Sequence, residues 1–320
     1  RGEPARGTYN SFVIDRINTT TRIGMSAQII DGKQVAADIR AELKAEVGRL
    51  VSKGVTPGLG VVLVGEDPAS HSYVSAKEKA CAEAGIHSAD HRLPADTSQS
   101  DLLALVDKLN NDPKIHGILV QLPLPKPLDE SEVLLRIDPD KDVDGFHPVN
   151  VGRMVIGEKA YLPCTPHGVV QLLARSNVDI AGAHVVIVGR SNIVGKPLAN
   201  MLLQKAPNAN ATVTICHTGT KDIAHHTRQA DIVIAAVGRP NTITADMIRD
   251  NAVVIDVGVN RIDDATRPRG YRLVGDVDYD AVKEKARLIT PVPGGVGPMT
   301  IAMQLHNTIE SAKRHHGIQN

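Results

Sequence analysis

The chain has 320 residues, which is enough for about two domains that each bury a core of their own. Its 36 basic and 36 acidic residues give a net charge of zero, and Trp is absent beside five Tyr and two Phe. This composition disfavours a nucleic-acid partner, which requires a basic surplus or a base-stacking surface. No apolar run approaches the roughly 18 residues of a membrane helix, so the sequence predicts no membrane partner either.

The first 24 residues lack a regular hydrophobic pattern. They contain four arginines and a run of three threonines, and the patterned sequence starts at Met25. We interpret residues 1–24 as a non-native leader or extension. A remnant of a transit peptide is the alternative, although Glu3 and Asp15 count against it because such peptides are poor in acidic residues.

The first half of the chain alternates between helical and extended patterns. Residues 32–52 are predicted to form a helix, since apolar residues recur every fourth position from Val35 to Val47. Buried strands are predicted at 59–64 and 117–122, with further helices at 70–84 and 100–110. This alternation is typical of a parallel α/β sheet.

A stretch rich in Pro, Asp and Gly, residues 123–165, separates the two halves. A second α/β series then follows, with a helix at 165–176, strands at 184–188, 211–216, 231–237 and 252–257, and a last helix at 298–314. The three cysteines form no CxxC pair, so neither a disulfide framework nor a zinc site is expected: Cys81, Cys164 and Cys216.

A glycine-rich turn follows the first strand of the second series. Gly189-Arg190-Ser191 ends the run VVIV and leads to Gly195, where a helix is expected to start. Such a strand–turn–helix unit is suited to binding phosphate through backbone amides. The turn lacks the second Gly of GxGxxG, and Pro197 stands where a P-loop needs Ser or Thr, so ATP chemistry is disfavoured.

The next strand predicts which dinucleotide the turn would bind. An enzyme for NAD places an acidic residue near the end of this strand to bind the ribose hydroxyl. Here the strand is followed by His217-Thr218-Gly219-Thr220, and Arg190 lies in the turn. A basic, hydroxyl-rich setting favours NADP, and a tight turn without a ligand is the alternative.

Tyr73 and Lys77 lie four residues apart on a predicted helix and therefore share a face. YxxxK also occurs in short-chain dehydrogenases, but there the glycine turn precedes the pair, whereas here it follows. Considered alone, the pair is better explained as part of a solvated helix face with an ordinary surface lysine. Gln121 ends a buried strand, where ligands of parallel sheets collect.

Two further segments carry polar or constrained residues. Asp142 and Asp144 are compatible with a carboxylate pair, with a metal site or with simple turn formation before Gly145. Residues 290–300 hold three prolines and three glycines before the last helix. Such a loop can form a ligand wall or a rigid entry to the helix.

Taken together, these segments resemble the bifunctional methylenetetrahydrofolate dehydrogenase/cyclohydrolase family from about Met25 to Lys313. Seven motifs occur in the family's order: SYVSAKEKAC, VQLPLP, DKDVDGFHPVN, PCTPHGV, VVIVGRSNIVGKP, VIDVGVN and TPVPGGVGPMT. The resemblance implies NADP-dependent oxidation of methylenetetrahydrofolate to the methenyl form, followed by hydrolysis to formyltetrahydrofolate. Such an enzyme supplies one-carbon units, for example to purine biosynthesis.

The resemblance also implies roles for individual residues. Lys77 would be central to hydrolysis, Gln121 would modulate it, Tyr73 would stack on the folate, and Asp144 would bind the pterin-like head group. The remaining residues implied to bind substrate are Pro293, Gly294, Gly295 and Pro298. Those implied to bind NADP are Gly189, Arg190, Ser191, Thr218 and Val259, and no metal is implied.

The expected fold is two α/β domains flanking a cleft. Residues 25–147 with 298–320 would form the folate-binding catalytic domain, and 148–297 a Rossmann-like NADP-binding domain. The resemblance further implies a homodimer and a cytoplasmic location, with the mitochondrial matrix as an alternative. Two other functions stay open at this point: an NADP oxidoreductase with a non-folate substrate, and a catalytically silent NADP-binding module.

Overall fold

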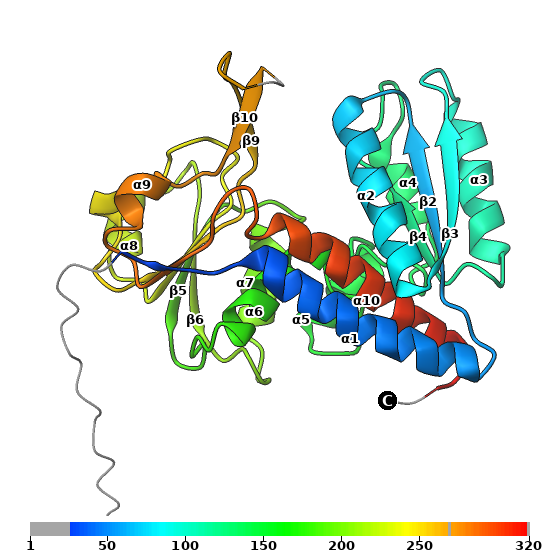
Figure 1. The fold of residues 1–320 in the computed structure, drawn as a ribbon, viewed down its shortest axis with the longest axis horizontal. Helices are drawn as coiled ribbons and strands as arrows, with labels where there is room; N and C mark the ends of the chain where they lie inside the picture. The colour runs from blue at the N-terminus through cyan, green and yellow to red at the C-terminus, as the bar shows by residue number, and fades with distance from the viewer. Residues whose placement is uncertain (1–25, 268–269, 319–320) are drawn as a thin grey trace, which may run out of the picture.

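The computed structural model describes residues 26–267 and 270–318, so the predicted leader lies outside the described residues. The chain forms two α/β units with two long helices beneath and between them (Figure 1): α1 (Gly32–Ser52) and α10 (Gly297–His315). Within the described ranges, no helix combines the length and apolar character needed to cross a bilayer.

The first unit is built on a three-stranded parallel sheet in the order β3-β2-β4. Its strands are β2 (Gly58–Val64), β3 (His87–Leu93) and β4 (Gly117–Val120), and its helices are α2 (Pro68–Ala84), α3 (Gln99–Asn111) and α4 (Glu130–Arg136). The predicted strands and helices of this half are confirmed, although β4 ends two residues early. Pro123 and Pro125 follow closely, and proline cannot donate to a strand ladder.

The second unit contains a six-stranded parallel sheet in the order β1-β11-β8-β7-β5-β6. Its strands are β1 (Gln28–Ile29), β5 (His184–Val188), β6 (Thr212–Cys216), β7 (Ile232–Ala235), β8 (Val253–Asp256) and β11 (Leu288–Ile289). The chain runs from β5 to β6 on one side and returns to β7 on the other. This reversal beside β5 is the topological switch point, where α/β sheets bind ligands.

The first described strand joins the sheet that the sequence analysis assigned to the other domain. The domain boundary at 25 places residues 25–31 with the first unit, but β1 pairs in parallel with β11. The chain therefore enters through the second unit and crosses to the first along α1. Asp31 caps α1 by accepting hydrogen bonds from the amides of Lys33 and Gln34.

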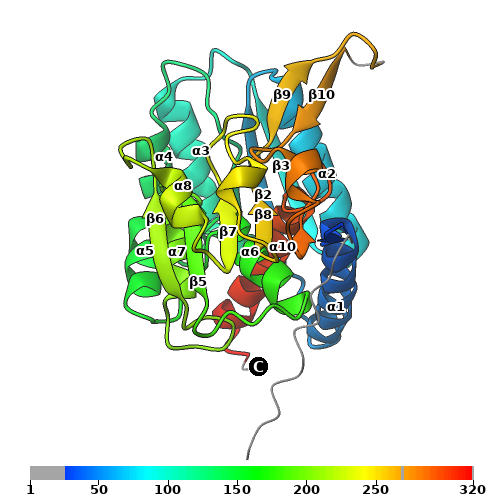
Figure 2. The ribbon, with the colours of Figure 1, turned by 90° about the vertical axis from the view of Figure 1, so that its left-hand side faces the viewer.

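Shorter helices and one hairpin complete the second unit. The helices are α5 (Pro148–Val155), α6 (Cys164–Arg175), α7 (Gly195–Leu202), α8 (Ile223–Thr227), α9 (Tyr279–Val282) and the 3₁₀ turn at Ala245–Met247. The antiparallel strands β9 (Asn260–Asp263) and β10 (Tyr271–Val274) form a hairpin that stands above the sheet (Figure 2).

One hydrophobic core joins the two units. Apolar side chains from the smaller sheet, α1, α10, α6 and the larger sheet form one continuous cluster, with Val61, Leu119, Leu305, Leu172 and Ile187 among its members. The outer faces of the two sheets each carry a separate cluster. Because α10 packs against both α1 and α6, it fixes the first unit relative to the second.

Candidate functional site

Lys77 projects from α2 into the protein interior. Pro68 opens this helix and the Asp67 carboxylate accepts a hydrogen bond from the Ser70 amide, which sets where the helix begins. Lys77 is only 8% exposed, whereas Tyr73, one turn earlier, is 50% exposed. The predicted pair therefore combines a buried amine with a solvent-facing aromatic ring one helical turn away.

Gln121 holds the Lys77 amine. The lysine Nζ donates a hydrogen bond to Oε1 of Gln121 at 2.9 Å. The Gln121 Nε2 in turn donates to the carbonyl of Leu122 at 2.7 Å, which orients the amide oxygen toward the lysine. The structure thus brings together two residues that lie 44 positions apart in sequence, one from α2 and one directly after β4.

Asp144 completes the cluster around Lys77. Burial lowers the pKa of Lys77, and the nearby Asp144 carboxylate partly opposes this effect. Burial likewise raises the pKa of Asp144, against the influence of Lys77 and of a hydrogen bond from Gln304. Burial thus shifts each group toward its neutral form.

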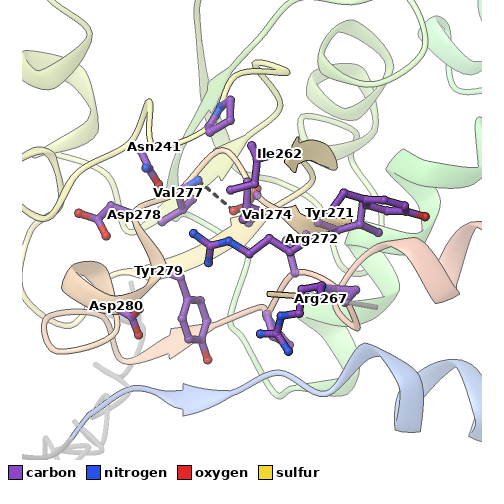
Figure 3. Close-up of a pocket in the computed structure, with 17 residues that line it drawn as sticks. Asn241, Ile262, Arg267, Tyr271, Arg272, Val274, Val277, Asp278, Tyr279 and Asp280 are labelled. Carbon is purple, nitrogen blue, oxygen red and sulfur yellow. Dashed lines mark hydrogen bonds between the residues drawn. The ribbon is translucent and has the colours of Figure 1, made fainter. Parts of the chain in front are cut away.

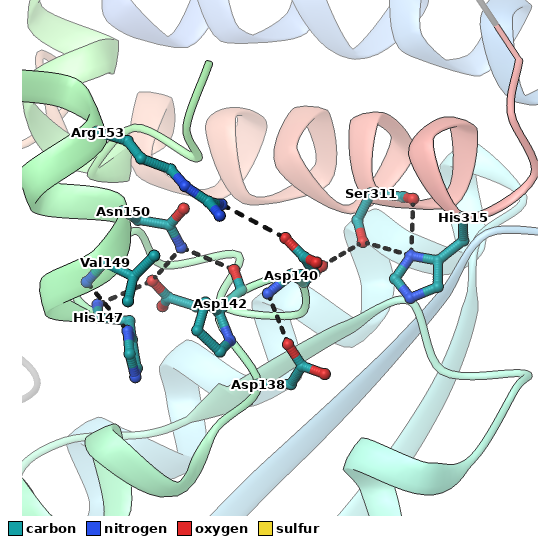
Figure 4. A network of polar contacts seen from close by, with 10 residues as sticks. Asp138, Asp140, Asp142, His147, Val149, Asn150, Arg153, Ser311 and His315 are labelled. Atoms are coloured by element: carbon teal, nitrogen blue, oxygen red, sulfur yellow. Dashed lines mark hydrogen bonds and ion pairs between the residues drawn. The ribbon is translucent and has the colours of Figure 1, made fainter. Parts of the chain in front are cut away.

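Asp142 has a structural role in the same turn (Figure 4). Its carboxylate accepts hydrogen bonds from the amides of Gly145, Phe146 and His147 and from Nδ2 of Asn150. Of the possibilities open from sequence, turn formation therefore applies to Asp142. In the described part of the chain, no three His, Cys, Asp or Glu side chains are grouped so as to hold a metal ion.

Replacing Asp142 by alanine is expected to destabilise the protein by about 3 kcal/mol, because four donors lose their shared acceptor in a buried turn. Urea unfolding would measure this loss. The control is Asp140→Ala, whose exposed carboxylate lies 3.6 Å from Arg153 and whose removal is expected to cost at most about 1 kcal/mol. Equal stability of the two variants would contradict the assigned role of Asp142.

The glycine turn after β5 packs tightly against neighbouring backbone. Gly189 has φ +134°, and a Cβ there would lie 2.1 Å from the carbonyl oxygen of Ala236 after β7. A Cβ on Gly195, where α7 begins, would lie 2.1 Å from the carbonyl oxygen of Gly189. Both positions therefore require glycine, because the backbone of the turn packs directly against neighbouring backbone. We call this turn, residues 189–195, the glycine cradle.

The remaining predicted cofactor residues also follow ends of parallel strands. The Ser191 hydroxyl accepts a hydrogen bond from the Val194 amide at 3.1 Å, directly before α7 begins. Arg190 is exposed, and its Nη1 lies 3.5 Å from Nε2 of His217, directly after β6. Thr218 follows His217, and Val259 follows β8. These residues thus lie along the carboxyl edge of the sheet, beside its switch point.

The loop between β11 and α10 is anchored by the first turn of α1. The Lys33 amide donates to the carbonyl of Gly294, and Gly32 approaches Gly295 so closely that a Cβ would clash with its carbonyl. Pro293 is exposed, whereas Gly294 and Gly295 are buried, and Pro298 lies in the first turn of α10. The predicted wall loop is therefore rigidly held, with Pro293 on its surface.

A groove of about 730 Å³ lies on the second unit between the hairpin, α9 and this loop (Figure 3). Arg272 and Tyr279 are among the side chains that line it, and Pro293 is the predicted substrate residue that it reaches. Lys77, Gln121 and Asp144 do not line it. This groove is therefore separate from the lysine cluster.

Sequence reasoning missed several residues that shape the site. Gln304 on α10 and the buried thiol of Cys164 on α6 lie beside Asp144 and Lys77. Asp276 accepts hydrogen bonds from the amides of Val237, Gly238 and Arg239 and thereby fixes the loop after β7. Asp256, the last residue of β8, accepts hydrogen bonds from the amides of Gly258, Asp276 and Val277. Its position at a strand end could have indicated it, but contacts between distant elements have no local sequence signal.

The chain matches two family descriptions. Residues 30–144 match the catalytic domain of tetrahydrofolate dehydrogenase/cyclohydrolase, and residues 163–316 match its NAD(P)-binding domain. A curated relative, the bifunctional protein FolD of Dehalococcoides mccartyi, is 62% identical over 296 residues, which cover 92% of this chain and 99% of the relative.

Two solved structures are also similar. The bifunctional FolD enzyme of Campylobacter jejuni is 49% identical, with a TM-score of 0.85 over 90% of this chain and 99% of that one. The FolD enzyme of Trypanosoma brucei, complexed with NADP cofactor and inhibitor, is 42% identical, with a TM-score of 0.86 over 91% of this chain and 98% of that one.

Proposed function

The chain belongs to the tetrahydrofolate dehydrogenase/cyclohydrolase family, and we propose that Lys77, Gln121 and Asp144 are the residues through which it acts on folate. The protein is a bifunctional enzyme that oxidises methylenetetrahydrofolate with NADP and hydrolyses the methenyl product to formyltetrahydrofolate. The family assignment favours this function over a non-folate oxidoreductase and over a silent NADP-binding module.

The glycine cradle after β5 suits NADP, because it follows a parallel strand beside the switch point of the sheet and leads into α7. When bound, NADP accepts a hydride from the methylene carbon of the substrate. The chain's own contribution to this step is alignment: Gly189, Arg190 and Ser191 hold the phosphate and ribose groups, and Thr218 and Val259 border the cofactor. An acid or base is not required, since the methenyl cation is stabilised by its two nitrogens.

Hydrolysis requires proton transfers that Lys77 is placed to perform. Water attacks the methenyl carbon, and the lysine amine accepts one proton from it as the new C–O bond forms. The C–N bond to one ring nitrogen then breaks, that nitrogen takes a proton, and the hydroxyl loses one as the formyl C=O forms. One proton is released overall, which balances the loss of the cation's charge.

The observation that carries this proposal is the hydrogen bond from the buried Lys77 amine to Gln121, beside Asp144. Gln121 orients the amine without adding a charge. Asp144, when ionised, accepts hydrogen bonds from N–H groups of the head group and opposes full loss of the lysine's charge. Tyr73 covers the ring system from its exposed position, and the loop with Pro293, Gly294, Gly295 and Pro298 forms the opposite wall. The comparison of Lys77→Met with its parent tests this proposal.

Arg190 is proposed to select NADP through the 2′-phosphate. Arg190→Ala is expected to lower kcat/KM for NADP about tenfold and to leave kcat/KM for NAD nearly unchanged, because NAD lacks the phosphate. Steady-state kinetics with both cofactors would measure the difference. A parallel decline with NADP and NAD would contradict selection through the phosphate.

The two units are proposed to divide the work. Apart from β1, which pairs in the larger sheet, residues 25–147 with 298–320 would bind folate and residues 148–297 would bind NADP. The substrate would lie in a cleft between Lys77 and the cofactor. Support comes from the lysine cluster in the first unit and the glycine cradle in the second. Selective loss of one activity in each unit's variants would be the expected sign of this division.

A homodimer formed through the cofactor units is also proposed. The hairpin of β9 and β10 pairs with no other strand in the described ranges, and a two-stranded hairpin gains stability when another surface covers it. Sedimentation should give about twice the 34.2 kDa chain mass. A species at the mass of one chain would contradict the dimer.

The proposed location is the cytoplasm, with the mitochondrial matrix as the alternative. The three buried cysteines are all free, which suits a reducing compartment, and the curated relative is bacterial. Fractionation of the source cells with an antibody to the chain would separate the two compartments.

A further inference from the structure

Gln304 makes a contact that the family roles above leave unexplained. This residue lies on α10, 160 positions from Asp144 in sequence, and is only 4% exposed. Its Nε2 donates a hydrogen bond to Oδ1 of Asp144 at 2.7 Å. Among the residues that the structure describes, no other side chain donates a hydrogen bond to this carboxylate. The orientation of Asp144 therefore depends on α10.

The same face of α10 fastens the whole turn that carries Asp144. One turn after Gln304, Nδ2 of Asn307 donates to the carbonyl of Val143 at 2.8 Å. One turn further, the Ser311 hydroxyl donates to the carbonyls of His116 and Asp140. These residues follow the spacing of one helix face, so Gln304 is held in a fixed position against Asp144.

The amide is not placed by any second partner in the described ranges. Oε1 of Gln304 is buried and accepts no hydrogen bond there, although buried polar atoms are normally paired. A leucine would fill a similar volume without leaving an oxygen unpaired. The contact with Asp144 is therefore the interaction that accounts for a glutamine at this position.

The chemistry of the contact explains why a neutral donor suits this position. The groups that face Asp144 are Lys77 from α2, Asp142 from its own turn and Cys164 from α6. Asp142 and burial favour a protonated Asp144, whereas Lys77 and Gln304 favour the ionised form. A second cation would also have disfavoured the charge on Lys77, and an amide avoids that effect.

We propose that Gln304 is a positioning residue that keeps Asp144 ionised and aimed at the head group of the folate. This inference rests on the proposed role of Asp144. The proposal adds a residue of the C-terminal helix α10, which otherwise packs in the core, to those that determine folate binding. Because Gln304 acts through Asp144, its removal should change the pH dependence of substrate use and not only its magnitude.

The test compares kcat/KM for methylenetetrahydrofolate at saturating NADP from about pH 5.5 to 9. Without the amide, the pKa of Asp144 rises further, so the ionised form is lost at a higher pH. Gln304→Leu is therefore expected to lower kcat/KM about tenfold near neutral pH and to move the acid limb upward by about one pH unit.

Gln304→Glu should give the opposite dependence. A protonated glutamic acid still donates to Asp144, whereas an ionised one repels it. Activity of this variant is expected to survive at acidic pH and to fall as pH rises. If Gln304→Leu does not fold, the pH profile of Gln304→Glu tests the inference by itself. The matched control is Thr308→Val, which removes a buried hydroxyl bonded to the Gln304 carbonyl and should leave the limbs of the profile in place.

The inference would be overturned if kcat/KM of both Gln304 variants rose and fell at the same pH values as in the parent. Asp144→Asn separates this failure from failure of the proposed site. An inactive Asp144→Asn beside unshifted Gln304 profiles would overturn the role of Gln304 alone. A fully active Asp144→Asn would overturn both.

Discussion

Lys77→Met is expected to lower the rate of methenyltetrahydrofolate hydrolysis by at least about a hundredfold, the contribution typical of a general acid or base. Hydride transfer is expected to fall less than about tenfold, because that step needs alignment and not proton transfer. Methionine retains most of the volume of the buried side chain and removes the amine that donates to Gln121. The two rates are measured separately, from the decay of methenyltetrahydrofolate and from the formation of NADPH.

The matched control for this experiment is Lys79→Met. Lys79 lies on the same helix, but its side chain is 78% exposed and pairs with Glu83 at 3.9 Å on the surface. Both activities of this variant should equal those of the parent. Methenyltetrahydrofolate turnover by Lys77→Met at the parent's rate would refute the assigned role of Lys77.

The second large effect is expected from Gly189→Ala. This variant should lose NADP binding and keep hydrolysis, the reverse of Lys77→Met. The added methyl group would lie 2.1 Å from the Ala236 carbonyl oxygen, in a backbone conformation that alanine disfavours. The turn must therefore shift, and we expect the Kd for NADP to rise at least about tenfold. Hydrolysis of added methenyltetrahydrofolate does not consume NADP, so this activity should persist in the folded variant. Calorimetric titration with NADP and the hydrolysis assay measure the two effects.

The control variant Gly182→Ala separates the effect of a positive φ from the effect of a steric clash. Gly182 also has a positive φ, +74°, but a Cβ there meets no atom within 4 Å. This variant is expected to lose some stability and to bind NADP like the parent. Unchanged NADP affinity in Gly189→Ala would show that the cradle after β5 is not the cofactor site.

Much of the fold could be predicted because its elements carry local signals. Helix α1 has an N-cap at Asp31 and a stripe of apolar residues, and β2 is an unbroken buried run. Strand β3 escaped prediction because its sequence, HSADHRL, is polar and half-exposed at the sheet edge. Strand β1 has two residues and is defined only by its pairing with β11. Pairing between strands so far apart in sequence leaves no local periodic pattern that could predict it.

Some residues of the candidate site could likewise be predicted from the sequence, and others could not. Gln121 and Gly189 stand at strand ends that favour ligand contact, so the sequence points to them, whereas Lys77 was singled out by the family resemblance. The structural role of Asp142 required coordinates, because from the residues alone the two carboxylates look alike until their hydrogen-bond partners are known. Gln304 was absent from the prediction since a single polar residue on an amphipathic helix has many possible roles.

The most direct test of the account is one time course of the parent enzyme with methylenetetrahydrofolate and NADP, in which NADPH and methenyltetrahydrofolate are followed separately. The account predicts that NADPH forms while methenyltetrahydrofolate decays faster than it does without enzyme. NADPH formation with methenyltetrahydrofolate decaying only at the uncatalysed rate would contradict the hydrolytic role of the Lys77 cluster. Such a result would leave a dehydrogenase alone.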